Sequence, residues 1–110
     1  MEKHNGYAPT VTAYFDADRR NDVEAFSETF LDDAVVEDEG ARHGGIAAIC
    51  QWWAAVKTAT NYVADPVEAT RDGDKALVRA NVSGQFPGSP VTLTFAFTTK
   101  NDKIARLEIK

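Results

Sequence analysis

Apolar residues in the first half of the chain recur at the three- and four-residue spacing of amphipathic helices. The first such face consists of Val11, Tyr14, Phe15 and Asp18. Pro9 lies just before it and suits the first turn of a helix, where its missing N–H is not needed. The spacing therefore predicts a helix that begins near Pro9 and buries this face.

Two further segments carry the helical spacing. The second predicted helix opens at Asn21, has Glu24 three residues on in a capping-box-like arrangement, and closes in a solvated turn at 32–33. Its buried stripe consists of Val23, Phe26 and Phe30. The third helix follows the glycine pair at 44–45. Its apolar face consists of Ile46, Ile49, Cys50, Trp53 and Val56.

Alternation of apolar and polar residues replaces the helical spacing near residue 60 and predicts an antiparallel meander. The predicted strands are 62–71, 75–86, 91–99 and 104–109, with a shorter one at 34–38 between the second and third helices. Asp72-Gly73-Asp74 is a strong hairpin turn, because Asp-Gly tolerates positive φ. Helices packed across a curved sheet are typical of an α+β fold and would leave a cone with a pocket.

Composition narrows the class of protein. The 110 residues form one domain, 1–110, and 12 basic against 17 acidic side chains give a net charge of −5. This acidity argues against nucleic acid or an anionic membrane as partner. One cysteine excludes an intrachain disulfide and suits a reducing cytoplasm. The most apolar stretch, 46–56, is too short to span a bilayer. We therefore expect a cytoplasmic domain.

One acidic residue differs from the others by its place in the predicted strand 34–38. Alternation puts Val36 and Asp38 on the same face of that strand. If Val36 faces the core, Asp38 points the same way, at the end of a strand where the interior begins to open. Its carboxylate is then either hydrogen-bonded by the neighbouring backbone or placed in a pocket where it exchanges protons.

The other candidates for chemistry are mostly aromatic. The Tyr14 ring is expected inside, with a hydroxyl that needs a partner, and Cys50 is interpreted as a small buried hydrophobic residue beside Trp53. His4 and His43 lack partners at metal-ligand spacing, and we expect neither a metal site nor a cofactor. The residues predicted to line a cavity, or simply to pack the core, are Val36, Trp53, Val63, Val82, Phe86, Phe95, Phe97 and Leu107.

Two stretches of sequence resemble a known superfamily. Residues 13–40, AYFDADRRNDVEAFSETFLDDAVVEDEG, resemble the opening of nuclear transport factor 2-like proteins, which include ketosteroid isomerases and SnoaL-like polyketide cyclases. Residues 42–53, RHGGIAAICQWW, are similar to the family's Gly-containing start of the third helix with its closing aromatic pair. The resemblance covers essentially the whole chain. It implies a cone-shaped, cystatin-like α+β barrel with three N-terminal helices on a curved, mostly antiparallel sheet.

The resemblance also implies roles for two residues. In ketosteroid isomerases an aspartate at the end of the first strand moves a proton, and a first-helix tyrosine stabilises the enolate oxygen. Asp38 and Tyr14 match these positions, which implies a cofactor-free isomerase, cyclase or dehydratase acting on an apolar carbonyl compound. The chain departs from the isomerases at Phe95, where they have a second carboxylic acid, and at Trp53, where they have a supporting tyrosine. The alternative is a noncatalytic module that binds a small apolar ligand.

The outward-facing side of the predicted sheet offers a possible interaction surface. Its predicted members are Arg79, Asn81, Thr92, Thr94 and Thr98. In the superfamily this face commonly mediates dimerisation, so the resemblance implies a homodimer, or an interaction module, built on it. A polar sheet face exposed to solvent is the simpler alternative.

Overall fold

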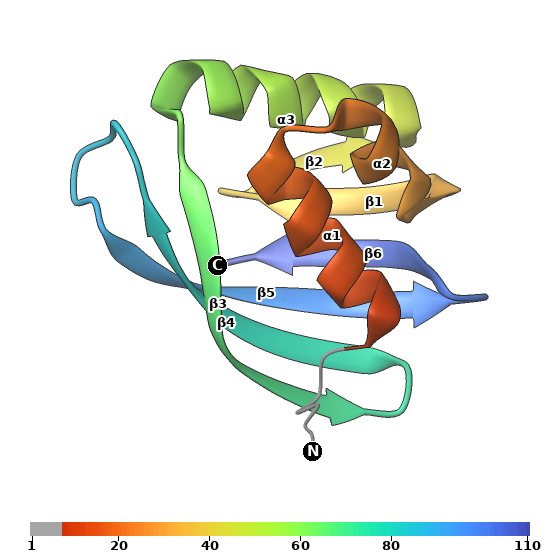
Figure 1. Cartoon of the computed structure of the whole chain (residues 1–110). Helices are drawn as coiled ribbons and strands as arrows, with labels where there is room; N and C mark the ends of the chain where they lie inside the picture. The colour runs from red at the N-terminus through yellow and green to blue at the C-terminus, as the bar shows by residue number, and fades with distance from the viewer. Residues whose placement is uncertain (1–7) are drawn as a thin grey trace.

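Three helices lie across one face of a curved sheet in the computed structural model, which describes residues 8–110 (Figure 1). The helices are α1 (Pro9–Arg20), α2 (Val23–Glu28) and α3 (Ile46–Thr60). Figure 1 shows α1 crossing in front of the sheet, with α3 along its upper end over β1 and β2. The helical layer therefore covers the inner, concave face of the sheet.

The six strands form one sheet in the order β2-β1-β6-β5-β4-β3. They are β1 (Phe30–Asp38), β2 (Ala41–Gly44), β3 (Val63–Asp72), β4 (Lys75–Ser83), β5 (Val91–Lys100) and β6 (Lys103–Ile109). β1 and β6 pair in parallel, whereas the other neighbouring strands are antiparallel. The sheet is open, since β2 and β3 are its two edges. This arrangement confirms the predicted cystatin-like α+β fold with a curved, mostly antiparallel sheet.

Local sequence signals set the ends of the first two helices. Pro9 occupies the first turn of α1, and Asn21 ends that helix in the left-handed conformation, at a φ of 55°. Asp22 then caps α2, because its side chain accepts a hydrogen bond from the backbone N–H of Ala25 at 3.0 Å. The first helix is confirmed, and the second begins at Val23 rather than at Asn21.

The boundary between α2 and β1 differs from the prediction. The helix ends at Glu28, and β1 starts at Phe30, so the turn predicted at 32–33 is wrong and those residues lie within the strand. Phe30 pairs with Ile104 of β6, and the Ile104 N–H donates to the Thr29 carbonyl at 2.8 Å. These backbone partners come from the far end of the sequence, and they override the helical spacing of Phe30.

The end of β4 also differs from the prediction. The strand expected to continue to Phe86 stops at Ser83, where the chain turns against the end of α3. A Cβ at Gly84 would lie 2.7 Å from the carbonyl oxygen of Thr60, and Gln85 donates its N–H to that same oxygen. Only glycine allows so close an approach of the two backbones. Phe86 therefore lies in the loop between β4 and β5.

A short hairpin that the pattern did not predict joins β1 to β2. Glu39 and Gly40 form its tip, with φ values of 52° and 79°. Positive φ at both central residues is the signature of a type I′ turn, whose twist matches that of the flanking strands. β2 has only four residues, too few for an alternating pattern to reveal it.

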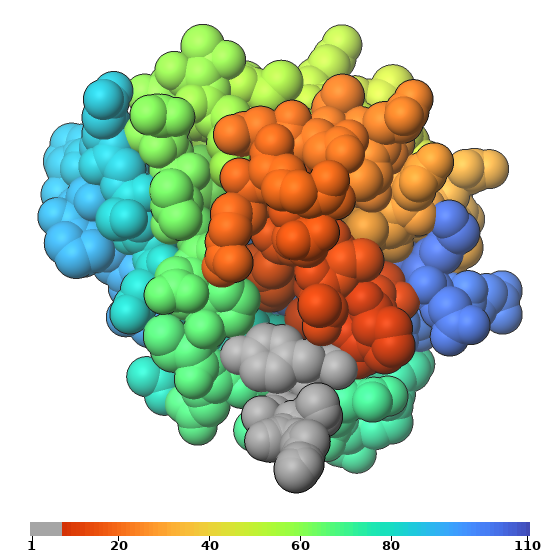
Figure 2. All heavy atoms as spheres, in the orientation of Figure 1, coloured from red at the N-terminus to blue at the C-terminus, as the bar shows by residue number. Residues whose placement is uncertain are grey.

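The hydrophobic core fills the space between the helices and the concave face of the sheet. In the space-filling view the atoms of α1 and α2 lie directly against those of α3 and β3 (Figure 2). β4 shows the expected alternation, with Ala76, Val78, Ala80 and Val82 buried. The strand register agrees with the predicted outer face, because Arg79 pairs with Thr94 and Asn81 pairs with Thr92. Leu77, on that outer face, is 52% exposed.

Candidate functional site

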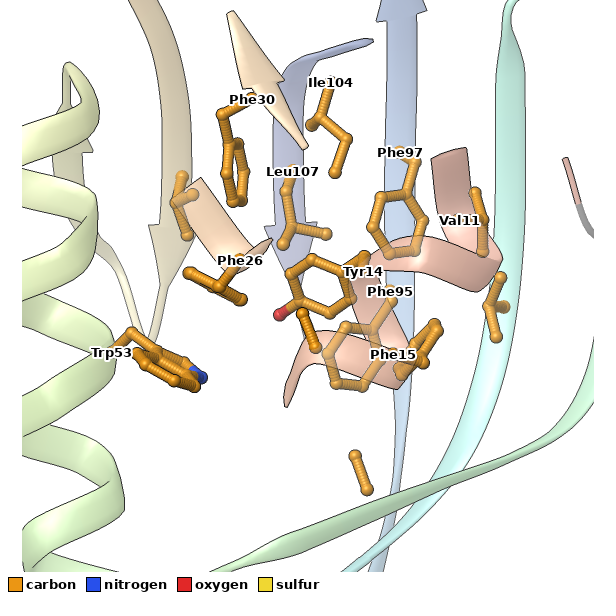
Figure 3. Packing of buried hydrophobic residues seen from close by; sticks show 14 of the residues in the cluster. Val11, Tyr14, Phe15, Phe26, Phe30, Trp53, Phe95, Phe97, Ile104 and Leu107 are labelled. Carbon is orange, nitrogen blue, oxygen red and sulfur yellow. The ribbon is translucent and has the colours of Figure 1, made fainter. Parts of the chain in front are cut away.

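Tyr14 lies at the centre of the core. Its side chain is 1% exposed, and its ring is surrounded by five phenylalanine rings with centroids between 5.0 and 6.3 Å away: Phe15, Phe26, Phe30, Phe95 and Phe97. Figure 3 shows the hydroxyl pointing toward the side of the core where Phe26 and Trp53 lie. Among residues 8–110 it has no hydrogen-bond partner. Burial, with the charges of Asp18 and Asp38, raises the pKa of Tyr14 well above its ordinary value.

Asp38 ends β1 on the inner side of the sheet, as strand alternation predicts. Val36 on the same face is fully buried, whereas the Asp38 side chain is only partly buried. Its Oδ2 accepts a hydrogen bond from the indole Nε1 of Trp52 at 3.0 Å. α3 therefore supplies the donor through an indole N–H, not through the backbone. The carboxylate stays partly accessible and, within residues 8–110, has one neutral donor.

His43 lies beside this pair. It is the cross-strand partner of Val36, and its ring stacks on Trp52 with centroids 5.7 Å apart and an interplanar angle of 29°. A carboxylate, an indole and an imidazole thus meet between the β1–β2 hairpin and α3. We call Asp38, Trp52 and His43 the hairpin cluster. Sequence reasoning considered His43 only as a metal ligand and missed this arrangement.

A second polar group, also missed, is built around Asp18, whose side chain is fully buried at the end of α1. Its Oδ1 accepts a hydrogen bond from Trp53 Nε1 at 2.7 Å and another from the Tyr62 hydroxyl at 2.6 Å. The Lys57 ammonium lies 3.4 Å from the same oxygen. We call these four residues the Asp18 cluster. Trp53 therefore donates to Asp18, at the position where the isomerases have a tyrosine that supports the first-helix tyrosine.

Lys57 is held in this cluster by several partners at once. Its ammonium donates to the backbone carbonyls of Asp18 and Tyr62, at 3.0 and 3.2 Å, and lies 4.0 Å from the centre of the Tyr62 ring. Burial raises the pKa of Tyr62 far above its ordinary value, and the nearby Tyr14 and Asp18 add to the effect. The signal for this cluster was the place of Asp18 on the apolar face of its helix, because a buried carboxylate requires paired donors.

The residues predicted to line a pocket are mostly packed together. Six of them belong to the same buried cluster as Tyr14: Val36, Trp53, Val82, Phe95, Phe97 and Leu107. Phe86 packs against that cluster from the loop and is partly buried. Val63 is 50% exposed at the start of β3. Their role as pocket walls remains a prediction.

Two hollows lie on the surface of the described residues, and the lining of neither includes Tyr14 or Asp38. The larger, about 600 Å³, is lined by Arg19, Val63, Asp65, Asn81, Ser83, Pro90, Val91 and Thr92. Arg19 and Asp65 face each other in it at 3.8 Å. The smaller, about 340 Å³, is lined by Thr12, Phe15, Asp16, Arg19 and Pro66. Both lie along the edge strand β3, at the opposite edge of the sheet from the hairpin cluster.

The remaining candidates add little chemistry. Cys50 is partly buried, and desolvation raises the pKa of its thiol, which lowers the fraction of the nucleophilic thiolate. Within residues 8–110 no group of three or more His, Cys, Asp or Glu side chains is gathered as metal ligands. His4 lies outside the described residues. None of the helices in this part of the chain is long and apolar enough to cross a membrane.

Comparison with known proteins defines the class first by fold. A protein from Catenulispora acidiphila DSM 44928 with a ketosteroid isomerase-like fold, solved with trimethylamine, superposes with a TM-score of 0.82 at 23% identity, over 93% of this chain and 84% of that one. A cystatin-fold protein from Novosphingobium aromaticivorans superposes with a TM-score of 0.80 at 20% identity, over 98% and 99% of the two chains. Both structures share the fold of this chain, and with the match to the SnoaL-like domain family they place it in the nuclear transport factor 2-like superfamily.

Within that superfamily the chain belongs to the SnoaL-like domain family, whose model matches residues 11–107. A crystal structure from Sinorhizobium meliloti, named "putative polyketide cyclase", is 66% identical, covers 94% of each chain and has a TM-score of 0.93. No curated protein matches the chain. One scaffold serves many activities in this family, so the residues of the site, and not the fold, determine the function.

Proposed function

We propose that the protein is a cofactor-free enzyme that moves protons on a small apolar carbonyl compound. Asp38 removes a proton from the carbon next to the carbonyl, and the Tyr14 hydroxyl donates a hydrogen bond to the oxygen on which negative charge develops. The isomerase, cyclase and dehydratase reactions share this first step, and the cyclase name of the Sinorhizobium meliloti relative agrees with it.

The observation that carries this proposal is the unpartnered hydroxyl of Tyr14. A buried hydroxyl without a partner costs about 1–3 kcal/mol of folding free energy, so proteins rarely keep one in the core without a use. Packing alone would be satisfied by phenylalanine, the residue that surrounds Tyr14 on several sides. A ligand oxygen in the core would supply the missing acceptor.

The state of Asp38 supports the same assignment. A general base needs a free lone pair, and the single neutral donor on Asp38 Oδ2 leaves the other oxygen available. The negative charge of Asp38 also contributes to the raised pKa of Tyr14, after burial and the charge of Asp18. One of the two oxyanion donors of ketosteroid isomerases is absent, because Phe95 stands at its position.

Exchange of substrate protons for deuterium tests the proposal without requiring the natural substrate. In D₂O, nuclear magnetic resonance follows loss of the protons next to the carbonyl in a panel of apolar ketones. We expect the protein to accelerate exchange for at least one of them. Asp38→Asn, which keeps an acceptor for Trp52, should lower that rate by about 10²–10⁴-fold. The same exchange rate in Asp38→Asn and the unchanged protein would refute the assignment.

The outer sheet face supports a second, independent proposal, that the protein forms a homodimer. Leu77 is 52% exposed in the middle of this face, beside hydrogen-bonding side chains of β4 and β5. The face commonly mediates dimerisation in nuclear transport factor 2-like proteins, and a dimer built on it would bury the Leu77 side chain. Sedimentation should give a dimer at micromolar concentration and a monomer for Leu77→Lys. A monomer for the unchanged protein would contradict it.

A further inference from the structure

The hairpin cluster contains a second group able to transfer protons. His43 and Asp38 both lie on the inner face of the β1–β2 hairpin, because His43 pairs with the buried Val36 and Asp38 pairs with Ala41. Residues diagonal to each other across an antiparallel pair are about 7–8 Å apart, so the two side chains are near neighbours. Histidine is the side chain that most readily holds and releases a proton near neutral pH.

The fold fixes this arrangement from two sides. The type I′ turn at Glu39-Gly40 sets the register of the hairpin, and a slip of one residue would turn His43 to the outer face. From α3, Trp52 contacts both groups, since its N–H bonds Asp38 while its ring stacks on His43. The indole therefore positions each of the two groups.

Two separate proton-transfer groups favour one reaction over the others. A shift of one proton between two carbons needs a single base that takes it and returns it. Elimination of water from a β-hydroxy carbonyl compound needs a base at one carbon and an acid at the hydroxyl on the next. Asp38 and His43, at diagonal positions across the hairpin, supply the two kinds of group that this reaction needs.

We propose that His43 is the general acid of the Asp38 site and that the site dehydrates apolar β-hydroxy carbonyl compounds. This inference rests on the proposed function. Asp38 takes the proton next to the carbonyl, and the electrons of that C–H bond form the enolate. Those electrons then make the C=C bond as the C–O bond to the hydroxyl breaks, and protonated His43 gives the leaving oxygen its proton, so that water departs. Proton transfer from Asp38 to His43 through solvent restores both groups.

The aldol adduct of acetone and benzaldehyde is a suitable probe, because it reports the two steps separately. Nuclear magnetic resonance in D₂O measures exchange at the carbon next to the carbonyl, and absorbance of the conjugated enone measures loss of water. We expect the unchanged protein to catalyse both. His43→Gln should lower elimination by about 10²–10⁴-fold while exchange stays within about threefold, and His43→Phe, which keeps a ring against Trp52, should do the same.

The other outcomes each have a definite meaning. Arg42→Gln is the control. Arg42 precedes His43 in β2 and pairs with Glu37, so its substitution should leave both rates unchanged. Elimination that survives in His43→Gln, or exchange and elimination that fall together in both His43 variants, would overturn the role of His43. Exchange without elimination in the unchanged protein would overturn the dehydratase assignment and leave the proposed function standing. Absence of both reactions would overturn both proposals.

Discussion

Asp18 and Asp38 lie under the same helix, α3, in opposite situations. Asp18 is fully buried, and one of its oxygens is contacted by an indole, a phenol and an ammonium group. Asp38 is partly buried and accepts one hydrogen bond, from the neighbouring tryptophan of the same helix. A carboxylate fixed by several donors holds the fold together, whereas one with free lone pairs can accept a proton. The difference separates a structural aspartate from a chemical one.

The largest effect should follow from removing the structural carboxylate. Asp18→Ala leaves the Lys57 ammonium without its counter-ion, and the Tyr62 hydroxyl and Trp53 N–H without an acceptor. Breaking a buried pair in this way typically costs about 3–5 kcal/mol of the free energy of unfolding. Urea denaturation measures the loss. The matched control on the same helix, Asp16→Ala, removes an exposed ion pair with Arg20 and should cost less than about 1 kcal/mol.

Alkaline pH should act on the same part of the core. Tyr14 and Tyr62 both have raised pKa values in the folded protein. Unfolded tyrosines lose their protons near pH 10, so above that pH the unfolded state binds fewer protons than the folded one. Stability is therefore unaffected by these two groups below about pH 10 and falls above it, by about 1.4 kcal/mol per pH unit for each tyrosine.

Urea denaturation between about pH 9 and pH 11 checks this slope. Tyr62→Phe should remove one of the two contributions and so flatten the fall. The two buried rings should ionise only when the protein unfolds, so their contribution to the absorbance of ionised tyrosine should rise together with unfolding. Ionisation of both rings near pH 10 in the folded protein, without loss of structure, would contradict the account.

The chemical carboxylate should contribute little to folding. Asp38→Ala removes one hydrogen bond at a partly exposed site, where water can replace the lost acceptor of Trp52. We expect a loss of about 1 kcal/mol or less in the same urea experiment. A loss of unfolding free energy as large as that of Asp18→Ala would show that both aspartates are structural.

The smallest effect on stability, and a large one on binding, is expected at Tyr14. Tyr14→Phe deletes a buried hydroxyl that has no partner among the described residues, so the free energy of unfolding should stay the same or rise by up to about 1 kcal/mol. The same change should weaken binding of a naphthol, whose oxygen mimics an enolate oxygen, by at least about tenfold. Fluorescence titration of the naphthol measures it, and equal affinity of both proteins would argue against a hydrogen bond to Tyr14.

Patterns within one element were enough to predict much of this molecule. The buried face of α1, the alternation of β4 and the inward direction of Asp38 follow from local spacing. Val23, predicted on the buried stripe of the second helix, is instead 51% exposed. The resemblance added the order of elements and the pair Asp38 and Tyr14. The start of β1 could not be predicted, because Phe30 is drawn into the sheet by Ile104 of β6.

The Asp18 cluster could not be predicted either, because it also depends on residues far apart in the sequence. Its donors stand far along the chain, Trp53 at a separation of 35 residues and Tyr62 at 44. Local spacing marks Asp18 as a buried polar residue but does not say which groups satisfy it. For the same reason, the sequence did not predict that Trp53 donates to Asp18 or that Trp52 donates to Asp38.

A crystal structure of the protein with a bound naphthol tests the central claim most directly. If Tyr14 and Asp38 form one proton-transfer site, the naphthol oxygen will lie about 2.5–3.0 Å from the Tyr14 hydroxyl, with the Asp38 carboxylate against the adjacent ring carbon. Binding of the naphthol in the hollow between Arg19 and Asp65, with the core around Tyr14 closed, would contradict the claim.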